Sequence, residues 1–183
     1  MKALILKYKS VIKFILTFLL VYSVLSLGYN WYLNVSKTSV NASDYVSHQV
    51  SKQSESLLNA IGYKAQVVKH ADEPSMKLIV RGKYVARVIE GCNSLSIIIL
   101  FISFVVAFSG RFKTTALFII FGSVIIYLVN VLRIVILSIG LYHYPWRSEL
   151  LHVVVFPGII YGMVFLLWML WVNKFSNIGK NKS

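Results

Sequence analysis

The chain is poor in cysteine and in acidic residues. Its 183 residues include one cysteine, which excludes an intramolecular disulfide, and six acidic residues against 19 lysines and arginines. There is no Gly-rich phosphate-binding loop, internal repeat or low-complexity tract. His143 and His152 are not accompanied by an Asp, Glu or Cys cluster at ligand spacing. We therefore expect neither a metal nor another cofactor.

Apolar residues, in contrast, are abundant. They make up 57% of the chain, and the mean hydropathy is +0.72. This composition is too apolar for an ordinary soluble domain and indicates an α-helical integral membrane protein. The net charge of +13 would suggest nucleic-acid binding in a soluble protein. In a membrane protein, an excess of basic residues in the cytoplasmic loops is the simpler explanation, so no nucleic-acid partner is expected.

Four apolar segments predict four transmembrane helices. They cover residues 14–32, 95–108, 115–141 and 151–172. The second is short, and it reaches the lower limit of about 17 residues for crossing a bilayer only when it starts near Cys92. The first follows four lysines, as in a signal peptide, and Ser26-Leu27-Gly28 resembles a cleavage site. Its length and its aromatic end favour an uncleaved anchor.

The charges define an orientation. The N-terminus, the loop with Arg111 and Lys113, and the C-terminal tail are basic and contain no acid, whereas all six acids fall between them on the other side. The positive-inside rule then places both termini in the cytoplasm. The chain divides into a basic N-terminus with the first anchor (1–33), an extracytoplasmic segment (34–90), a three-helix membrane core (91–173) and a basic cytoplasmic tail (174–183).

The extracytoplasmic segment is predicted to form a small α+β unit between the first two transmembrane helices. Asn41 or Ser43 is expected to cap a helix that ends near Ala60. Apolar alternation and turn signals predict three strands, at residues 63–70, 76–80 and 84–89. A core this small is expected to be stable only when it rests on the membrane helices.

Three residues suited to chemistry fall at one depth on this topology. Cys92 lies at the outer end of the second helix, His152 at the outer start of the fourth, and Arg133 in the outer leaflet of the third. Each has a plainer explanation, because a lone Cys is often a small hydrophobe and interfacial His and Arg side chains reach for headgroups. Tyr127, Asn130 and Arg133 repeat at one helical turn, so this face is expected to point into the protein. Hydrogen bonding between helices is the alternative role for this stripe.

The three residues together fit acyl transfer by a cysteine nucleophile. A thiol reacts as its thiolate, which a nearby cation favours. His152 would take the thiol proton and return it to a leaving amine. Arg133 would stabilise the thiolate or the oxyanion of a tetrahedral intermediate.

Two other features have mainly architectural interpretations. Glu90, two residues before the thiol, is expected to pair with Arg133 or, more simply, with Arg87 or Lys83. Gly158 and Gly162 form a Gly-x-x-x-Gly pattern, which predicts that another helix packs closely there.

These motifs give the chain a resemblance to a known family. Gly91-Cys92-Asn93-Ser94 opens one apolar segment, Asn130-Val131-Leu132-Arg133 lies in the next, and His152 opens the one after. The order Cys, Arg, His and its outer placement resemble the exosortase/archaeosortase family, and the short length resembles the F-type exosortases of Gram-negative bacteria. Many members have a small residue and then Gly after the Cys, where this chain has Asn93 and Ser94.

The resemblance implies a function and a location. Family members are thought to cleave C-terminal sorting signals of exported proteins (a short motif, a span and a basic tail) and to join the new C-terminus to an acceptor. It implies that Cys92 is the nucleophile, Arg133 the stabilising cation and His152 the acid and base. The supporting residues would be Asn93, Asn130, Glu90 and Tyr127.

The same resemblance implies the bacterial inner membrane, a site facing the periplasm, and membrane lipid and an unidentified acceptor as partners. A non-catalytic membrane subunit, or a receptor that binds sorting-signal tails or an exported partner, is the alternative function.

Overall fold

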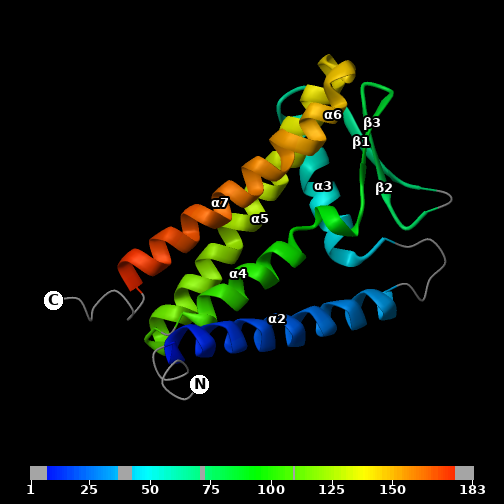
Figure 1. Cartoon of the computed structure of the whole chain (residues 1–183). Coiled ribbons are helices and arrows are strands. Elements are labelled where there is room, and N and C mark those ends of the chain that lie inside the picture. Colours follow the sequence, from blue (N-terminus) through cyan, green and yellow to red (C-terminus); the bar gives the residue numbers. More distant parts are fainter. Residues whose placement is uncertain (1–7, 37–42, 71–72, 109, 176–183) are drawn as a thin grey trace.

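The computed structural model describes residues 8–36, 43–70, 73–108 and 110–175, and it is mostly helical (Figure 1). The long helices are α2 (Lys9–Ser36), α5 (Phe112–His143) and a continuous helical stretch from Pro145 to Phe175. That stretch contains a 3-10 turn (Pro145–Arg147), α6 (Ser148–Leu150), a π-helical turn (Leu151–Val155), α7 (Phe156–Leu170) and a second π-helical turn (Trp171–Phe175). The shorter elements are α3 (Tyr45–Ala60), β1 (Ala65–Lys69), β2 (Met76–Val80), β3 (Lys83–Val88), a 3-10 turn η1 (Glu90–Cys92) and α4 (Leu95–Ala107).

Three helices of the described chain are long and apolar enough to cross a membrane. They are α2, α5 and the stretch from Pro145 to Phe175. The expected fourth, built on residues 95–108, does not extend back to Cys92, because the chain forms the separate turn η1 and the helix begins at Leu95. With 13 residues and a rise of about 1.5 Å per residue, α4 is roughly 20 Å long, short of the ~30 Å hydrocarbon core.

The segment before Cys92 contains the expected helix and three strands. The strands form an antiparallel meander in the order β1-β2-β3, each close to its predicted position, with an irregular register between Leu78 and Ile79. The helix cap was predicted wrongly. Asp44 caps α3, because its carboxylate accepts a hydrogen bond from the Ser47 amide at 3.0 Å. The Ser43 hydroxyl is buried without a partner, and Asn41 lies outside the described residues.

The small sheet and α3 share one core with the neighbouring end of α5. Val50, Leu58 and Leu78 are fully buried in a cluster that also includes Val131 and Ile134 of α5. The buried face of α3 is otherwise made of small side chains (Ser47, Ser51 and Ser54), which allow it to lie close to its neighbours. The α+β unit is therefore built against a membrane helix, as its small size predicts.

A second core joins α4, α5 and α7 toward the opposite end of the bundle. Phe101 and Trp171 are completely buried in it. Gly122 of α5 permits the close packing, because a methyl group there would collide with the Phe101 ring. Helix α2 buries none of its residues and lies along α4, where the centroids of the Phe14 and Phe108 rings are 4.5 Å apart.

The pair Gly158 and Gly162 corrects another expectation. Both glycines are exposed, and no atom lies within 4 Å of a Cβ placed on either one. Within the described residues, no helix packs against this face of α7.

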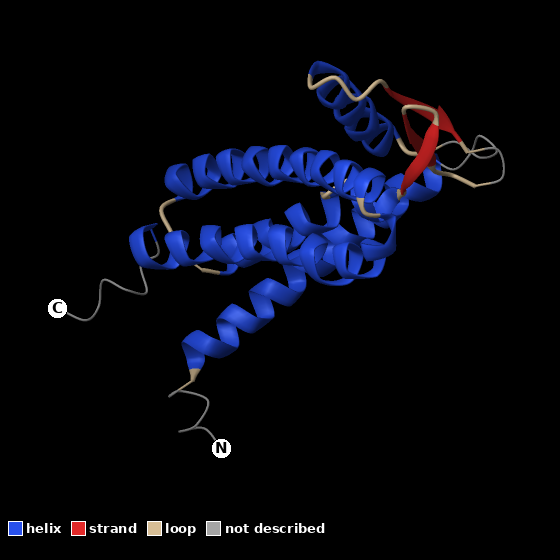
Figure 2. Cartoon of the chain, turned by 90° about the horizontal axis from the view of Figure 1, so that it is seen from above, coloured by secondary structure: helices blue, strands red, loops and turns tan. Residues whose placement is uncertain are grey.

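The start of α2 and the last helical turn both lie at the end of the bundle opposite the sheet (Figures 1 and 2).

Candidate active site

The single thiol sits where the sheet meets the membrane helices. Cys92 ends the turn η1, which follows β3 directly, and its side chain is free and partly exposed. Its backbone amide donates to the Ile89 carbonyl at 2.8 Å. Its carbonyl accepts a hydrogen bond of 2.7 Å from the Nδ2 amide of Asn130 on α5. The main chain carrying the thiol is thus fixed on both sides by hydrogen bonds that do not use sulfur.

Asn93 holds the other side of this turn. It is 1% exposed, and its Oδ1 accepts from the Leu95 amide at 3.0 Å, which satisfies one of the free donors at the start of α4. Its Nδ2 amide donates to the Tyr29 hydroxyl of α2 at 3.1 Å and to the Asp44 carboxylate at 3.4 Å. One asparagine therefore ties α2, α3 and α4 together immediately after the thiol.

Arg133 lies on α5, one helical turn beyond Asn130. Its side chain is buried, with 7% of the residue exposed, and no described acidic residue forms an ion pair with it. The guanidinium carbon lies 3.9 Å from the centroid of the Phe156 ring. The Nε donor is buried without a partner. This is a buried cation that is oriented by an aromatic ring and keeps a donor for an anion.

The polar residues Asn130 and Tyr127 of α5 have different roles. Asn130 is fully buried, and its Nδ2 amide donates a hydrogen bond to the Cys92 carbonyl, while its Oδ1 atom is buried without a partner. Tyr127, one turn away, lies beside Gln53 of α3 and is partly buried in the shared core. Asn130 thus belongs to the thiol site, whereas Tyr127 supports the α+β unit.

His152 lies in the π-helical turn Leu151–Val155. This turn leads directly into Phe156, the residue that stacks on Arg133, so the main chain at His152 is about one turn from that contact. Such turns are rare and are frequent at functional sites. Pro157 follows Phe156 and has no amide hydrogen to donate within the helix. The approach of the His152 side chain to the thiol stays a prediction.

Comparison with known families settles the relationship of the chain. A family described as transmembrane exosortase matches residues 3–172. The chain belongs to the transmembrane exosortase family. No curated protein sequence and no solved structure matches it. Membership indicates a transpeptidase-like role in the membrane, which fits a partly exposed cysteine at the end of a helix bundle.

The backbone of this chain has an unusual conformation two residues after the thiol. Ser94 has a φ of +65°, in the left-handed region that favours glycine. This is the position where many members of the resembling family have Gly. The left-handed conformation costs a non-glycine residue roughly 1–2 kcal/mol. The Ser94 hydroxyl donates to the Asn93 carbonyl at 2.6 Å, which partly offsets this cost. Serine is therefore compatible with the turn behind the thiol.

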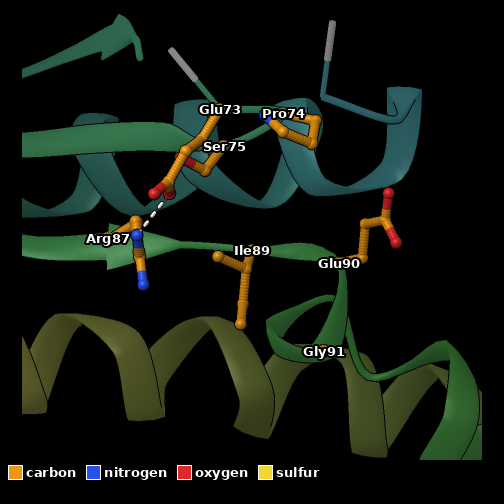
Figure 3. Close-up of a pocket in the computed structure, with 7 residues that line it drawn as sticks. All are labelled: Glu73, Pro74, Ser75, Arg87, Ile89, Glu90 and Gly91. Atoms are coloured by element: carbon orange, nitrogen blue, oxygen red, sulfur yellow. Dashed lines mark hydrogen bonds and ion pairs between the residues drawn. The ribbon is translucent and has the colours of Figure 1, made fainter. Parts of the chain in front are cut away.

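An open pocket of about 380 Å³ lies immediately before the thiol of the exosortase. Figure 3 shows the turn before β2 on one side, the end of β3 on the other and Gly91 below. Arg87 forms an ion pair with Glu73 across this hairpin, not with Glu90 as one of the sequence-based alternatives held. The pairing of Glu90 with Arg133 is also not found, since no described acidic residue pairs with Arg133. The lining residues are Glu73, Pro74, Ser75, Arg87, Ile89, Glu90 and Gly91.

Sequence reasoning missed the partners of this site. Asp44, Tyr29 and Phe156 hold Asn93 and Arg133 in place. Asp44 at the start of a predicted helix was a signal for the cap, because Asp is among the preferred N-cap residues. For Tyr29 and Phe156 the sequence contains no comparable signal, since aromatic residues are frequent throughout the apolar segments.

Proposed function

We propose that the protein is a membrane-embedded cysteine transpeptidase. It cleaves C-terminal sorting signals of exported proteins through a thioacyl-enzyme and transfers them to an acceptor. The observation that carries this proposal is the junction of η1 and α5, where Asn130 holds the main chain of Cys92 and the buried Arg133 lies one helical turn beyond Asn130 on the same helix. Family membership supports the same chemistry.

The reaction has two balanced halves. In the first, His152 takes the proton of Cys92, sulfur attacks the scissile carbonyl, and the amide C–N bond breaks as the proton is passed to the leaving amine. Arg133 stabilises the negative charge on sulfur and then on the carbonyl oxygen. In the second half, the acceptor nucleophile loses its proton to His152 and attacks the thioester carbonyl, the C–S bond breaks, and His152 returns the proton to the leaving sulfur. Asn130 and Asn93 keep the thiol in place during both halves.

We further propose that the chain lies in the bacterial inner membrane with both termini in the cytoplasm and the thiol facing the periplasm. Helix α4, with the turns that flank it, completes the fourth crossing. The residues are divided as the charges predict, into an anchor (1–33), an extracytoplasmic segment (34–90), a catalytic core (91–173) and a basic tail (174–183). The position of both helical ends opposite the sheet supports this topology (Figure 1).

Topology reporters test this arrangement. We expect fusions after Lys113 and Ser183 to report the cytoplasm, and fusions at Ser75 and Pro145 to report the periplasm, because basic loops are retained inside. A cytoplasmic signal at Ser75 would place Cys92 on the wrong face for exported substrates.

The C-termini of surface proteins test the reaction itself. In cells that contain the chain, mass spectrometry is expected to find surface proteins that have lost a C-terminal span and basic tail. A mass increase on the new C-terminus would identify the acceptor, and a free carboxylate would indicate hydrolysis. Identical C-termini in cells without the chain would contradict the proposal.

A further inference from the structure

An apolar groove lies where α4 ends and α5 begins, at the other end of α4 from Cys92 (Figure 1). Its volume is about 370 Å³, within the range of about 300–1,000 Å³ that is typical of sites for small molecules. On α5 the lining residues recur at intervals of three and four, so they share one face of the helix. A ligand that fits this groove is apolar over most of its length. The lining residues are Val106, Gly110, Phe112, Thr115, Ala116 and Ile119.

The surface around the groove is basic. The start of α2, the connection from α4 to α5 and the last helical turn lie at the same end of the bundle (Figures 1 and 2). The chain has no acidic residue before Asp44, between Glu90 and Glu149, or after Glu149, so none of these elements carries an acid. The apolar groove thus opens beside positive charge that no acid of the same elements offsets. The exposed cations at this end include Lys9, Lys13, Arg111, Lys113 and Lys174.

Two of these cations lie at the unfavourable end of a helix. Arg111 is the N-cap of α5 and Lys113 lies in its first turn, which contains no acid and has no side-chain cap. The N-terminus of a helix carries partial positive charge and unpaired amide donors, so basic side chains are disfavoured there. An anionic group bound at this position would offset the repulsion and accept hydrogen bonds from the amides. The start of α5 therefore suits an anion.

The floor of the groove contains a buried donor without a partner. A Cβ on Gly110 would lie 2.9 Å from Cζ2 of Trp171 and 3.0 Å from the Thr115 hydroxyl oxygen, so only glycine fits without a shift. Trp171 is completely buried, and its Nε1 donor has no hydrogen-bond partner. Cζ2 is two bonds from Nε1, so this donor is close to Gly110. A buried donor of this kind costs stability unless a ligand or water satisfies it.

From these observations we infer that the groove binds one anionic glycerophospholipid of the cytoplasmic leaflet. An acyl chain lies against Val106, Ala116 and Ile119. The phosphate lies at the start of α5, between Arg111 and Lys113. The inference depends on the orientation proposed above and not on the proposed reaction.

Other occupants fit the charges of this groove less well. A zwitterionic lipid offers the same chain, but its own positive charge weakens the attraction to the basic surface. The basic tail of a sorting signal is repelled by the same cations. A second copy of the chain has the same orientation in the membrane and would bring its own basic end to the groove. An anionic lipid avoids all three conflicts.

Photolabelling tests the inference on the full-length protein in nanodiscs. The nanodiscs contain phosphatidylcholine and a small proportion of phosphatidylglycerol that carries a diazirine in one acyl chain. Mass spectrometry is expected to find the label mainly on residues 106–119. Unlabelled phosphatidylglycerol should compete about fivefold better than phosphatidylcholine, the factor expected for one Lys or Arg beside an anionic headgroup. This advantage should weaken at high salt.

Variants separate the chain from the headgroup. Ala116→Phe fills the groove without changing the charge and is expected to remove most of the label, whereas Leu117→Phe, at the exposed position next to it and outside the lining, leaves the label in place. Combined Arg111→Gln and Lys113→Gln is expected to make the two lipids compete equally. Arg147→Gln, an exposed cation at the other end of the bundle, should keep the advantage of phosphatidylglycerol.

Several results would overturn the inference, and the first two need only the unmodified chain. One is a label on residues 106–119 no stronger than on the exposed Leu128 and Leu132 of α5, which would indicate an ordinary lipid shell. Another is equal competition by phosphatidylcholine. A third is crosslinking of the groove to a second copy, and a fourth is unchanged labelling in Ala116→Phe. None of them bears on the proposed reaction, because processing of sorting signals tests that separately.

Discussion

Replacing Cys92 by Ser is expected to abolish processing of sorting signals, with a loss on the order of 10³-fold or more. The hydroxyl is almost never ionised near neutral pH, so the nucleophile is lost although the side chain keeps its shape. The hydrogen bonds that fix this residue use only its main-chain atoms, from the amide to Ile89 and from Asn130 to the carbonyl. The variant should therefore fold and enter the membrane normally. Accumulation of uncleaved precursors, measured by immunoblot and by mass spectrometry of their C-termini, checks the prediction.

Ser96→Ala provides a matched control. Ser96 is an exposed small polar residue in the first turn of α4, close to Cys92 in the sequence, and it has no part in the proposed chemistry. We expect normal processing from this variant. The alternative function, a non-catalytic subunit or receptor, predicts instead that Cys92→Ser supports its partner as well as the unmodified chain does.

Replacing Arg133 by Gln is expected to reduce processing by about 10²–10³-fold, the usual loss when one oxyanion-stabilising group is removed. Gln retains hydrogen-bonding capacity but removes the positive charge and the stacking on Phe156. Because a cation favours the thiolate, maleimide alkylation of Cys92 at neutral pH should also slow. Arg133→Lys keeps the charge without the planar group, so it should restore much of the alkylation rate and less of the processing.

Ser138→Ala separates these effects from a disturbed helix. Ser138 lies further along α5, is fully buried, and donates only to the Ile134 carbonyl of its own helix. Its loss should leave alkylation and processing unchanged. Unchanged alkylation in Arg133→Gln would show that the guanidinium serves packing and does not act on the nucleophile.

The sequence predicts the helices and strands of this fold better than the connections between them. Hydropathy locates the three long helices, and alternation locates the strands to within a few residues, because both signals are repeated along each element. The segment 95–108 was expected to reach spanning length by starting near Cys92, whereas α4 begins at Leu95, where the apolar run itself begins. The turn that separates η1 from α4 depends on the left-handed backbone of Ser94 and on the Asn93 side chain. A local pattern does not reveal either of them.

In the candidate site, too, the sequence identifies individual residues but not the contacts that orient them. Cys92 and Arg133 were singled out because a thiol at a boundary and a charge within a span are unusual. What orients them comes from elsewhere in the chain. Asn93 bonds to Tyr29 and Asp44 across separations of 64 and 49 residues. Arg133 stacks on a phenylalanine of another helix. Such contacts follow from tertiary packing and are not encoded in any single segment.

The short length of α4 has a consequence for the lipid around the enzyme. On the proposed topology, with α4 as the fourth crossing, a helix of roughly 20 Å beside three longer ones would create a hydrophobic mismatch with a hydrocarbon layer of ~30 Å. Bilayers adapt to such a helix by thinning locally, at a modest cost for each ångström. We expect the bilayer to be thinnest over Leu95 and the thiol, so that water reaches deeper there than it does in unperturbed lipid. The balance between hydrolysis and transfer of the thioester would then depend on membrane thickness as well as on the protein.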